Sequence, residues 1–102
     1  ISSLSLPNSV TTIEYGAFYG NQISSLTIPN SVTTIGNSAF SDNQISSLTI
    51  PKSVTSIGEW AFSSNPLTSI LIKRTKEDFT ANVTVGMYWY GTSNNTTITY
   101  EP

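Results

Sequence analysis

The sequence contains no cysteine and no histidine, and only 10% of its 102 residues are charged. These absences exclude a thiol nucleophile, an imidazole base, a zinc site with Cys or His ligands, and any disulfide. The four basic residues are too few to build a nucleic-acid-binding surface. The longest unbroken aliphatic run, Ile70-Leu71-Ile72, is far too short to span a membrane.

Serine and threonine together make up 32 residues, and the net charge is −2. Apolar residues make up 37% of the chain and recur at regular spacing, which argues against disorder and for one small folded domain. Sparse charge with many hydroxyl side chains is typical of secreted bacterial surface modules. The chain opens at Ile1 without an initiator methionine or a signal-like segment, so we expect a piece of a longer or processed protein.

A 22-residue unit occurs three times without a gap. The copies are ISSLSLPNSVTTIEYGAFYGNQ over residues 1–22, ISSLTIPNSVTTIGNSAFSDNQ over 23–44 and ISSLTIPKSVTSIGEWAFSSNP over 45–66. A fourth copy begins as LTSILI over residues 67–72 and then diverges. We therefore divide the chain into repeats over residues 1–72 and a C-terminal cap over residues 73–102.

The apolar positions of one copy predict a strand followed by an irregular return. In the second copy, Leu26-Thr27-Ile28 alternates apolar and polar residues as a half-buried strand does. Pro29 follows at once and predicts the end of the strand, because proline has no N–H to donate. The other inward-pointing residues lie on a second, irregular side and at the corner beside it: Val32, Ile35, Ala39 and Phe40.

One unit alone leaves these apolar groups exposed, whereas stacked copies bury them against each other. The repeat therefore predicts a solenoid in which each copy forms one coil and the strands run parallel. Two interior columns follow from the period, one with Leu4, Leu26, Leu48 and Ile70, the other with Phe18, Phe40 and Phe62.

Asparagine and glycine also recur with the period. We expect Asn21, Asn43 and Asn65 to form a buried ladder in which each amide satisfies the loop of the next coil. The alternative is a plain exposed turn asparagine. Gly36 and Gly58 suggest a sharp bend, although the first copy has Glu14 at that place.

The pattern LTIPxSVTxIGxxAFxxN resembles the BspA-like leucine-rich repeat family of bacterial surface proteins. The resemblance covers residues 1 to about 72. Family members often have Cys where Asn43 stands, and many have more repeats than this chain. The matching positions in one copy are Leu26, Ile28, Pro29, Val32, Ile35, Gly36, Ala39, Phe40 and Asn43.

The resemblance implies a fold and a setting. The implied fold is a right-handed leucine-rich repeat solenoid, with a parallel β-sheet on one face, irregular coils on the other and little helix. The implied setting is extracellular and attached to the bacterial surface, and some members adhere to host or matrix proteins. The family has no catalytic motif, so no catalytic residue follows from it.

The segment over residues 67–102 is interpreted as one enlarged terminal coil with its cap. Thr75, followed three residues later by Asp78, has the pattern of a helix start. The terminal repeat of the family often ends in a TIxY strand, which fits the last residues. The expected elements are a short helix over Lys76–Ala81, a loop over Gly91–Asn95 and a last strand over Thr97–Tyr100.

The two ends of the solenoid are expected to differ, because a cap has to cover the last coil. The candidate covering residues are Phe79, Val83, Val85, Met87 and part of the run Tyr88-Trp89-Tyr90. No such segment precedes the first coil, which predicts exposure of Ile1, Leu4 and Leu6 beside an open strand edge. This end predicts self-association through the first coil or a missing upstream region.

Acidic residues offer the main remaining route to catalysis, since a Ser-Lys dyad has no distinctive pattern here. No two of them recur as a pair across the copies, and the helix start explains the adjacent Glu77 and Asp78. We therefore expect no enzyme, no cofactor and no metal site. The full set is Glu14, Asp42, Glu59, Glu77, Asp78 and Glu101.

The outward residues of the predicted strands are candidate binding residues, because they form two columns made almost entirely of hydroxyls. The alternative is that small β-compatible hydroxyls merely solvate an exposed sheet, and the near identity of the copies favours it. The residues are Ser3, Ser5, Ser25, Thr27, Ser47, Thr49, Ser69 and Leu71.

Aromatic residues are the second candidate set. Tyr88, Trp89 and Tyr90 can stack on sugars or anchor a protein contact, with packing inside the cap as the alternative. On the irregular side, Tyr15, Tyr19 and Trp60 are expected to be partly exposed, or Trp60 to pack under the cap. The basic residues Lys73, Arg74 and Lys76 are offset by neighbouring acids, which favours a solvated charged face.

The sequence therefore predicts a non-catalytic interaction module at the C-terminal end of a leucine-rich repeat array. Its expected partner is an extracellular protein or glycan, with no nucleic acid and no membrane span. The alternative is a structural spacer or array terminus without a ligand of its own. Ordered, exposed aromatic residues beside the sheet favour the binding module over the spacer.

Overall fold

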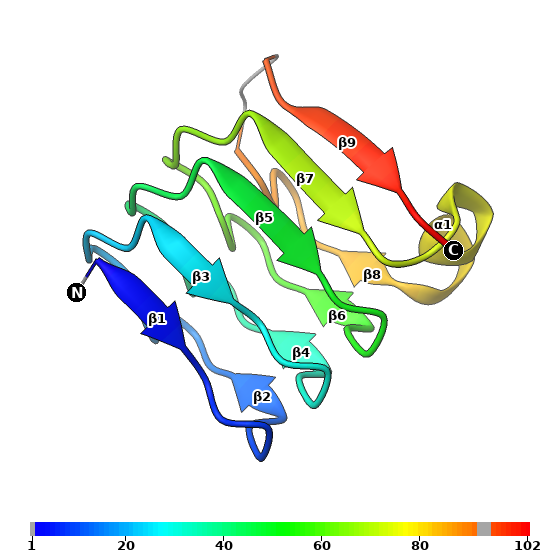
Figure 1. The fold of residues 1–102 in the computed structure, drawn as a ribbon, viewed down its shortest axis with the longest axis horizontal. Coiled ribbons are helices and arrows are strands. Elements are labelled where there is room, and N and C mark those ends of the chain that lie inside the picture. Colours follow the sequence, from blue (N-terminus) through cyan, green and yellow to red (C-terminus); the bar gives the residue numbers. More distant parts are fainter. Residues whose placement is uncertain (1, 92–94) are drawn as a thin grey trace.

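The computed structural model describes residues 2–91 and 95–102, and these residues form a stack of coils (Figure 1). Each of the first four coils carries one strand on a front side and one on a back side, and β9 adds a fifth front strand. The front strands are β1 (Ser3–Ser5), β3 (Ser25–Thr27), β5 (Ser47–Ile50), β7 (Ser69–Ile72) and β9 (Thr97–Tyr100). The back strands are β2 (Thr12–Ile13), β4 (Thr34–Ile35), β6 (Ser56–Ile57) and β8 (Thr84–Val85). The predicted repeat solenoid is confirmed.

Every strand pairing is parallel and joins equivalent residues of adjacent coils. In the front layer, for example, Ser3 pairs with Ser25, and Leu48 pairs with Ile70. The front strands form two sheets, β1-β3 and β5-β7-β9, and the described residues include no ladder between β3 and β5. The sequence does not indicate this division, because the second and third copies are nearly identical at these strands.

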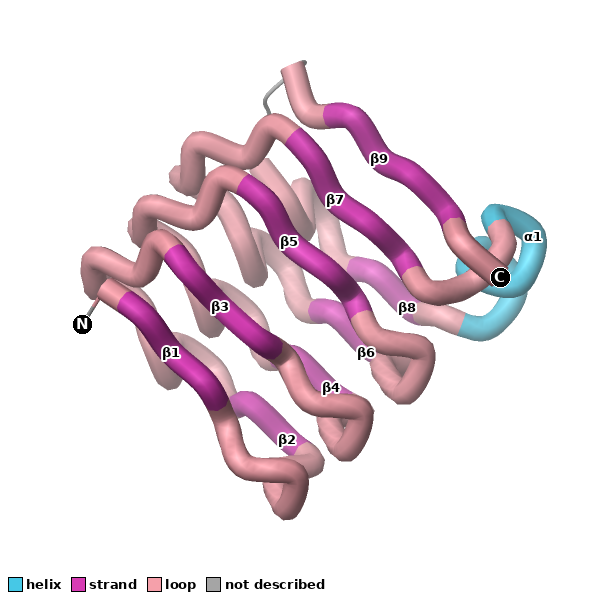
Figure 2. Tube along the Cα trace, in the orientation of Figure 1, coloured by secondary structure: helices cyan, strands magenta, loops and turns pink. Residues whose placement is uncertain are grey.

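The back layer is more regular than expected. Its strands form one continuous sheet in the order β2-β4-β6-β8, visible behind the front strands in Figure 2. Backbone hydrogen bonds join adjacent coils on both sides of each short strand, for example Thr33 N to Thr11 O (2.8 Å) and Gly36 N to Ile13 O (2.7 Å). The expectation of an irregular second side was wrong because two-residue strands are too short to show a hydrophobic alternation.

The interior is built from columns of equivalent apolar side chains. The rings of Phe18 and Phe40 stack with centroids 5.3 Å apart, and those of Phe40 and Phe62 with centroids 5.2 Å apart. Leu48 and Ile70 are buried, whereas Leu4 is half-buried at the first coil. Stacking of the coils thus buries apolar side chains that a single coil would leave exposed.

A ladder of asparagine amides closes the coils. The Oδ1 atom of Asn43 accepts a hydrogen bond from Ile23 N (3.0 Å), and its Nδ2 atom donates to the carbonyls of Phe18 and Phe40 (3.0 Å each). Asn65 makes the equivalent bonds one coil later. The expected direction was wrong: Asn43 and Asn65 bond their own coil and the preceding one, not the next, and Asn21 donates to Phe18 O of its own coil. Asn43 is buried, whereas Asn21 and Asn65 are half-buried.

The recurring glycines allow close approach of neighbouring coils. A Cβ atom on Gly58 would lie 2.3 Å from Asn37 Oδ1 and 2.5 Å from Asn37 N, and one on Gly36 would lie 2.7 Å from Tyr15 N. Gly86 is equally close to the backbone of Glu59. The expected sharp bend is therefore not the main reason for glycine here, since the previous coil leaves no space for a side chain.

The fourth coil is longer than the others and carries the helix. Ser56 pairs with Thr84, 28 positions later, whereas Thr34 pairs with Ser56, 22 positions later. The additional residues hold α1 (Lys76–Asn82), whose first turn is capped by the Thr75 hydroxyl accepting from Asp78 N (3.1 Å). This helix is not long and apolar enough to cross a lipid bilayer, and the described residues contain no other α-helix.

The cap differs in part from the expected set. Phe79 and Val83 are buried, and the Phe79 ring lies 5.9 Å from that of Tyr100 on β9. Val85 and Met87, expected to cover the last coil, are exposed instead. Val85 lies in β8, the outermost strand of the back sheet, and Met87 lies in the turn that follows it.

Candidate interaction surfaces

The outward residues of the front strands form the two columns predicted from the sequence, and we call this surface the front face. Ser3, Ser25, Ser47 and Ser69 make the first column, and Ser5, Thr27, Thr49 and Leu71 make the second. All are exposed except Leu71, which is half-buried.

Strand β9 extends both columns with residues that the sequence analysis missed. Thr97 pairs with Ser69 and Thr99 pairs with Leu71, and both threonines are exposed. The alternation Thr97-Ile98-Thr99 repeats that of Ser25-Leu26-Thr27, so the signal was present in the sequence. The front face therefore presents hydroxyl groups on all five front strands.

A second surface lies where each back strand is followed by a turn, over residues 15–18, 37–40, 59–62 and 87–90. We call the first two positions of these turns the turn edge. The second position has positive φ in every coil: 62° at Gly16, 57° at Ser38, 60° at Trp60 and 52° at Tyr88. Left-handed backbone costs about 1–2 kcal/mol for residues with a side chain, so coils 3 and 4 place bulky aromatics where glycine is most favourable.

Two of the three aromatic residues on this edge, Trp60 and Tyr88, contact each other. The ring centroids of Trp60 and Tyr88 are 5.0 Å apart with an interplanar angle of 35°. Trp60 remains 41% exposed and Tyr88 remains 49% exposed. Trp60 therefore contacts a residue of the C-terminal cap and is also exposed to solvent.

The other two aromatic candidates point inward. Trp89 is only 6% exposed and packs edge-on against Phe62, with centroids 6.4 Å apart. It also lies 4.8 Å from the ring of Tyr90, which is half-buried. Of the predicted aromatic set, Tyr88 is exposed, whereas Trp89 is buried and Tyr90 is half-buried. Trp89 and Tyr90 therefore pack mainly within the cap.

The sequence analysis missed the equivalence of Trp60 and Tyr88, because the fourth copy contains an insertion and has diverged in sequence. The register aligns Thr84-Val85-Gly86 with Ser56-Ile57-Gly58. The run Met87-Tyr88-Trp89-Tyr90 therefore takes the place of Glu59-Trp60-Ala61-Phe62. With six inserted residues before Val83, Gly86 falls at the same repeat position as Gly58.

The first coil contributes two further exposed tyrosines, Tyr15 and Tyr19. The Asp42 carboxylate, hydrogen-bonded to the Tyr19 hydroxyl, raises the pKa of Tyr19 above its usual value, and the negative charge of Asp42 acts in the same direction.

The charged residues near α1 largely pair with each other. Lys73 forms a salt bridge with Glu101, and Arg74 forms one with Asp78 (3.0 Å) while also donating to the Lys52 carbonyl (2.7 Å). A hydrogen bond from Asn82, aided by the positive charge of Arg74, lowers the pKa of Asp78. Two of the three basic residues in this cluster are thus paired with carboxylates, which leaves little net charge for an anionic partner.

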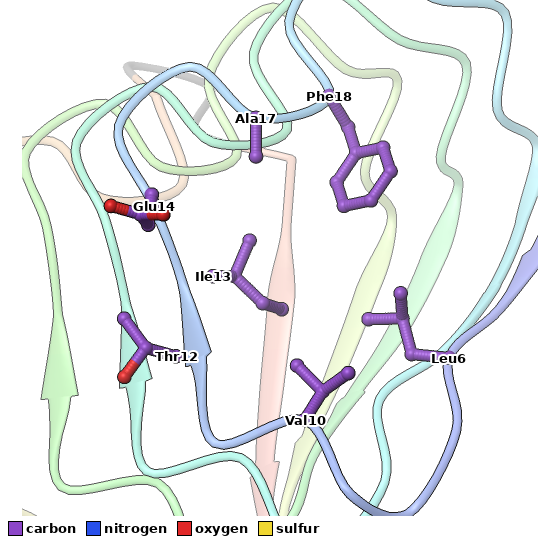
Figure 3. A pocket seen from close by; sticks show the side chains of 7 residues that line it. All are labelled: Leu6, Val10, Thr12, Ile13, Glu14, Ala17 and Phe18. Carbon is purple, nitrogen blue, oxygen red and sulfur yellow. The ribbon is translucent and has the colours of Figure 1, made fainter.

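The open end of the first coil holds a cavity of about 220 Å³ (Figure 3). Half-buried Leu6, Val10 and Phe18 line it together with buried Ile13, and exposed Glu14 lies at its margin. Leu4 and Leu6 are partly exposed, as expected, and Ile1 lies outside the described residues. In the second coil, the equivalent apolar positions are covered by the first coil. In the first coil they are partly exposed at this end.

The acidic residues do not assemble into a site. No group of three or more Asp or Glu side chains in the described part of the chain is placed to hold a metal ion. The polar groups on the two surfaces are mainly hydroxyls and amides, which are suited to hydrogen bonding.

Comparison with known proteins identifies the repeat. A family model described as BspA type leucine rich repeat region (6 copies) matches residues 1–100. The match includes most of the segment over residues 73–102, which agrees with the structural finding that this segment contains the rest of a diverged fourth repeat. No curated protein and no solved structure matches the chain.

Proposed function

The chain belongs to the BspA-type leucine-rich repeat family, and we propose that it is an interaction module that binds a protein or glycan partner outside the cell. Members of this family are typically bacterial surface or extracellular proteins, and we propose the same setting here. The repeats of the family generally serve interaction or structure, and we propose that this chain has no catalytic activity.

The observation that carries the proposal is the pair of exposed columns on the front face. Ten outward positions on five parallel strands are all serine or threonine except Leu71. Neighbouring strands are about 4.8 Å apart, so the columns extend over roughly 20 Å, a length that suits a contact made of many hydrogen bonds. Small hydroxyl side chains also lose little conformational entropy when a partner immobilises them.

A structural spacer is the second candidate function. The observation in its favour is that the outward residues barely change from coil to coil, whereas a surface shaped for one partner usually varies along an array. A spacer needs only solubility on this face, which serine and threonine supply. The two functions differ in whether changes on the front face alter any binding event.

The test is a binding screen of the whole chain against extracellular-matrix proteins and glycans. The variant Ser25→Lys/Ser47→Lys places two long cations in one column, where they clash with a docked partner. The matched control is Asn8→Lys/Asn30→Lys, in the turn where the third copy already has Lys52. Binding that is lost in the first variant and kept in the second supports the proposal. Equal binding by both variants would mean that the contact lies away from the front face, and no binding by the wild type would favour the spacer.

A further inference from the structure

The exposed apolar side chains of this protein gather on the turn edge. The described residues include six exposed large hydrophobic residues, and four of these lie at the first or second position of a turn: Tyr15, Trp60, Met87 and Tyr88. Three of these belong to the third and fourth coils, which are neighbours in the stack. The front face, by contrast, carries almost only hydroxyls.

The Trp60 and Tyr88 rings form the centre of this apolar surface. They occupy the same turn position in adjacent coils, and the column of rings ends at Trp60, because the second coil has Ser38 and the first has Gly16 at that place. The side of the indole toward the second coil therefore has no ring against it. Both rings are held by a left-handed backbone that favours glycine, so the chain keeps them there despite an unfavourable conformation.

The surroundings of the pair fit a neutral ligand rich in hydroxyl groups. The first two turn positions of all four coils contain one charged residue, Glu59, and no cation. Asn37 lies beside the pair, since its Oδ1 accepts a hydrogen bond from Glu59 N (2.9 Å). Amide, carboxylate and hydroxyl groups next to an exposed aromatic face match a pyranose ring, which has an apolar C–H face and a rim of hydroxyls.

A protein contact fits less well. Aromatic anchors of protein interfaces usually fill a closely packed pocket that excludes water. The turn positions beside the two rings are instead largely polar, with Asn37, Ser38 and Glu59, and supply few apolar contacts around such an anchor. We propose that Trp60 and Tyr88 form a stacking platform for the sugar rings of a neutral glycan. This inference rests on the proposed function as an interaction module, and it adds a second contact surface, on the turn edge, to the front face.

The test uses four neutral hexasaccharides, those of β-1,4-glucose, β-1,3-glucose, β-1,4-N-acetylglucosamine and α-mannose. Binding to the whole chain is followed by tryptophan fluorescence and by calorimetry. Trp60 is exposed and Trp89 is buried, so a sugar on the platform changes the emission of the more accessible indole. Removing either ring should weaken binding about three- to tenfold, and removing both should abolish it.

The variants Trp60→Gly and Tyr88→Gly suit this test because glycine favours the positive φ at both positions. Thermal unfolding of both variants checks that the fold persists. Ser38→Gly is the matched control, since it makes the same backbone change at the equivalent position of the second coil without removing a ring.

Binding of one of these hexasaccharides that Trp60→Gly and Tyr88→Gly weaken, and that Ser38→Gly does not, supports the inference. Absence of binding to all four sugars overturns it, as does sugar binding that survives loss of both rings. A protein partner that depends on the front face and not on the rings leaves the proposed function standing while the platform fails. A protein partner that needs the rings, with no sugar binding, makes the pair a protein contact and also overturns the inference.

Discussion

The indole of Trp60 lies 5.0 Å from the phenol ring of Tyr88 because both residues occupy the same turn position in adjacent coils. The contact depends on α1, whose insertion moves Tyr88 28 positions along the chain, and not 22, while leaving the register of the back sheet intact. The fourth coil thus behaves as a repeat in structure, although its sequence has diverged.

The left-handed backbone at Trp60 predicts an unusual order of stability among its variants. Trp60→Gly and Trp60→Ala both lose the contact with Tyr88, but only alanine keeps a Cβ at a φ of 60°. We expect Trp60→Gly to be more stable than Trp60→Ala by about 1 kcal/mol in urea unfolding. Alanine matching or exceeding glycine would show that the position is not held in the left-handed region.

The asparagine ladder predicts unequal costs for equivalent substitutions. Asn43→Ala leaves Ile23 N without its acceptor and removes one of the two asparagine hydrogen bonds at each of the Phe18 and Phe40 carbonyls, and we expect a loss of about 3 kcal/mol. Asn21→Ala removes a hydrogen bond to Phe18 O at the half-open first coil, and we expect about 1 kcal/mol. Chemical unfolding of both variants tests this, and equal losses would contradict the ladder as the source of stability.

The glycines predict a contrast between steric exclusion and backbone strain. In Gly58→Ala the new methyl group meets the backbone and side chain of Asn37, and we expect a loss of about 3 kcal/mol. In Gly16→Ala the new methyl group has no atom within 4 Å, so we expect only the cost of a positive φ, a loss of about 1 kcal/mol in stability. Thermal unfolding of the two variants side by side measures the difference, and the reverse order would be inconsistent with the packing of the coils described above.

The open end of the first coil leads us to propose association with a second copy of the chain. Light scattering should then show a mass that rises above 11.0 kDa with concentration. Leu6→Lys puts a charge into the apolar cavity and should weaken association at least about tenfold, whereas Asn30→Lys should not. Glu14 stands where later coils have glycine against their neighbour, so Glu14→Gly should strengthen association.

A mass of 11.0 kDa at every concentration would contradict this proposal. It would also mean that partly exposed Leu4 and Leu6 are tolerated in water, as single exposed apolar residues commonly are.

The regular part of the fold was predictable because stacking amplifies the repeat. Identical residues such as Phe18 and Phe40 have to meet their own counterparts when coils stack in register, so the period alone predicts the interior columns. The helix at Lys76–Asn82 was predictable from its capping residue Thr75, because the signal is local in sequence.

Other features depend on contacts between coils that sequence spacing does not reveal. The insertion hid the equivalence of Gly86 and Gly58, and with it the surface position of Tyr88. The role of the glycines depends on the distance to the preceding backbone, which no single copy specifies. For the front face, the sequence predicted which residues point outward, and their binding role stays a prediction.

The central claim is that the front face binds a partner, and NMR mapping of this 11.0 kDa chain tests it most directly. The partner is added from the screen of matrix proteins and glycans, and amide shifts are followed for every residue. The account predicts the largest changes along β3, β5 and β7, at residues such as Ser25, Ser47 and Ser69, and small changes along the back sheet. Changes confined to the back sheet or the helix, or a screen without any binding partner, would contradict it.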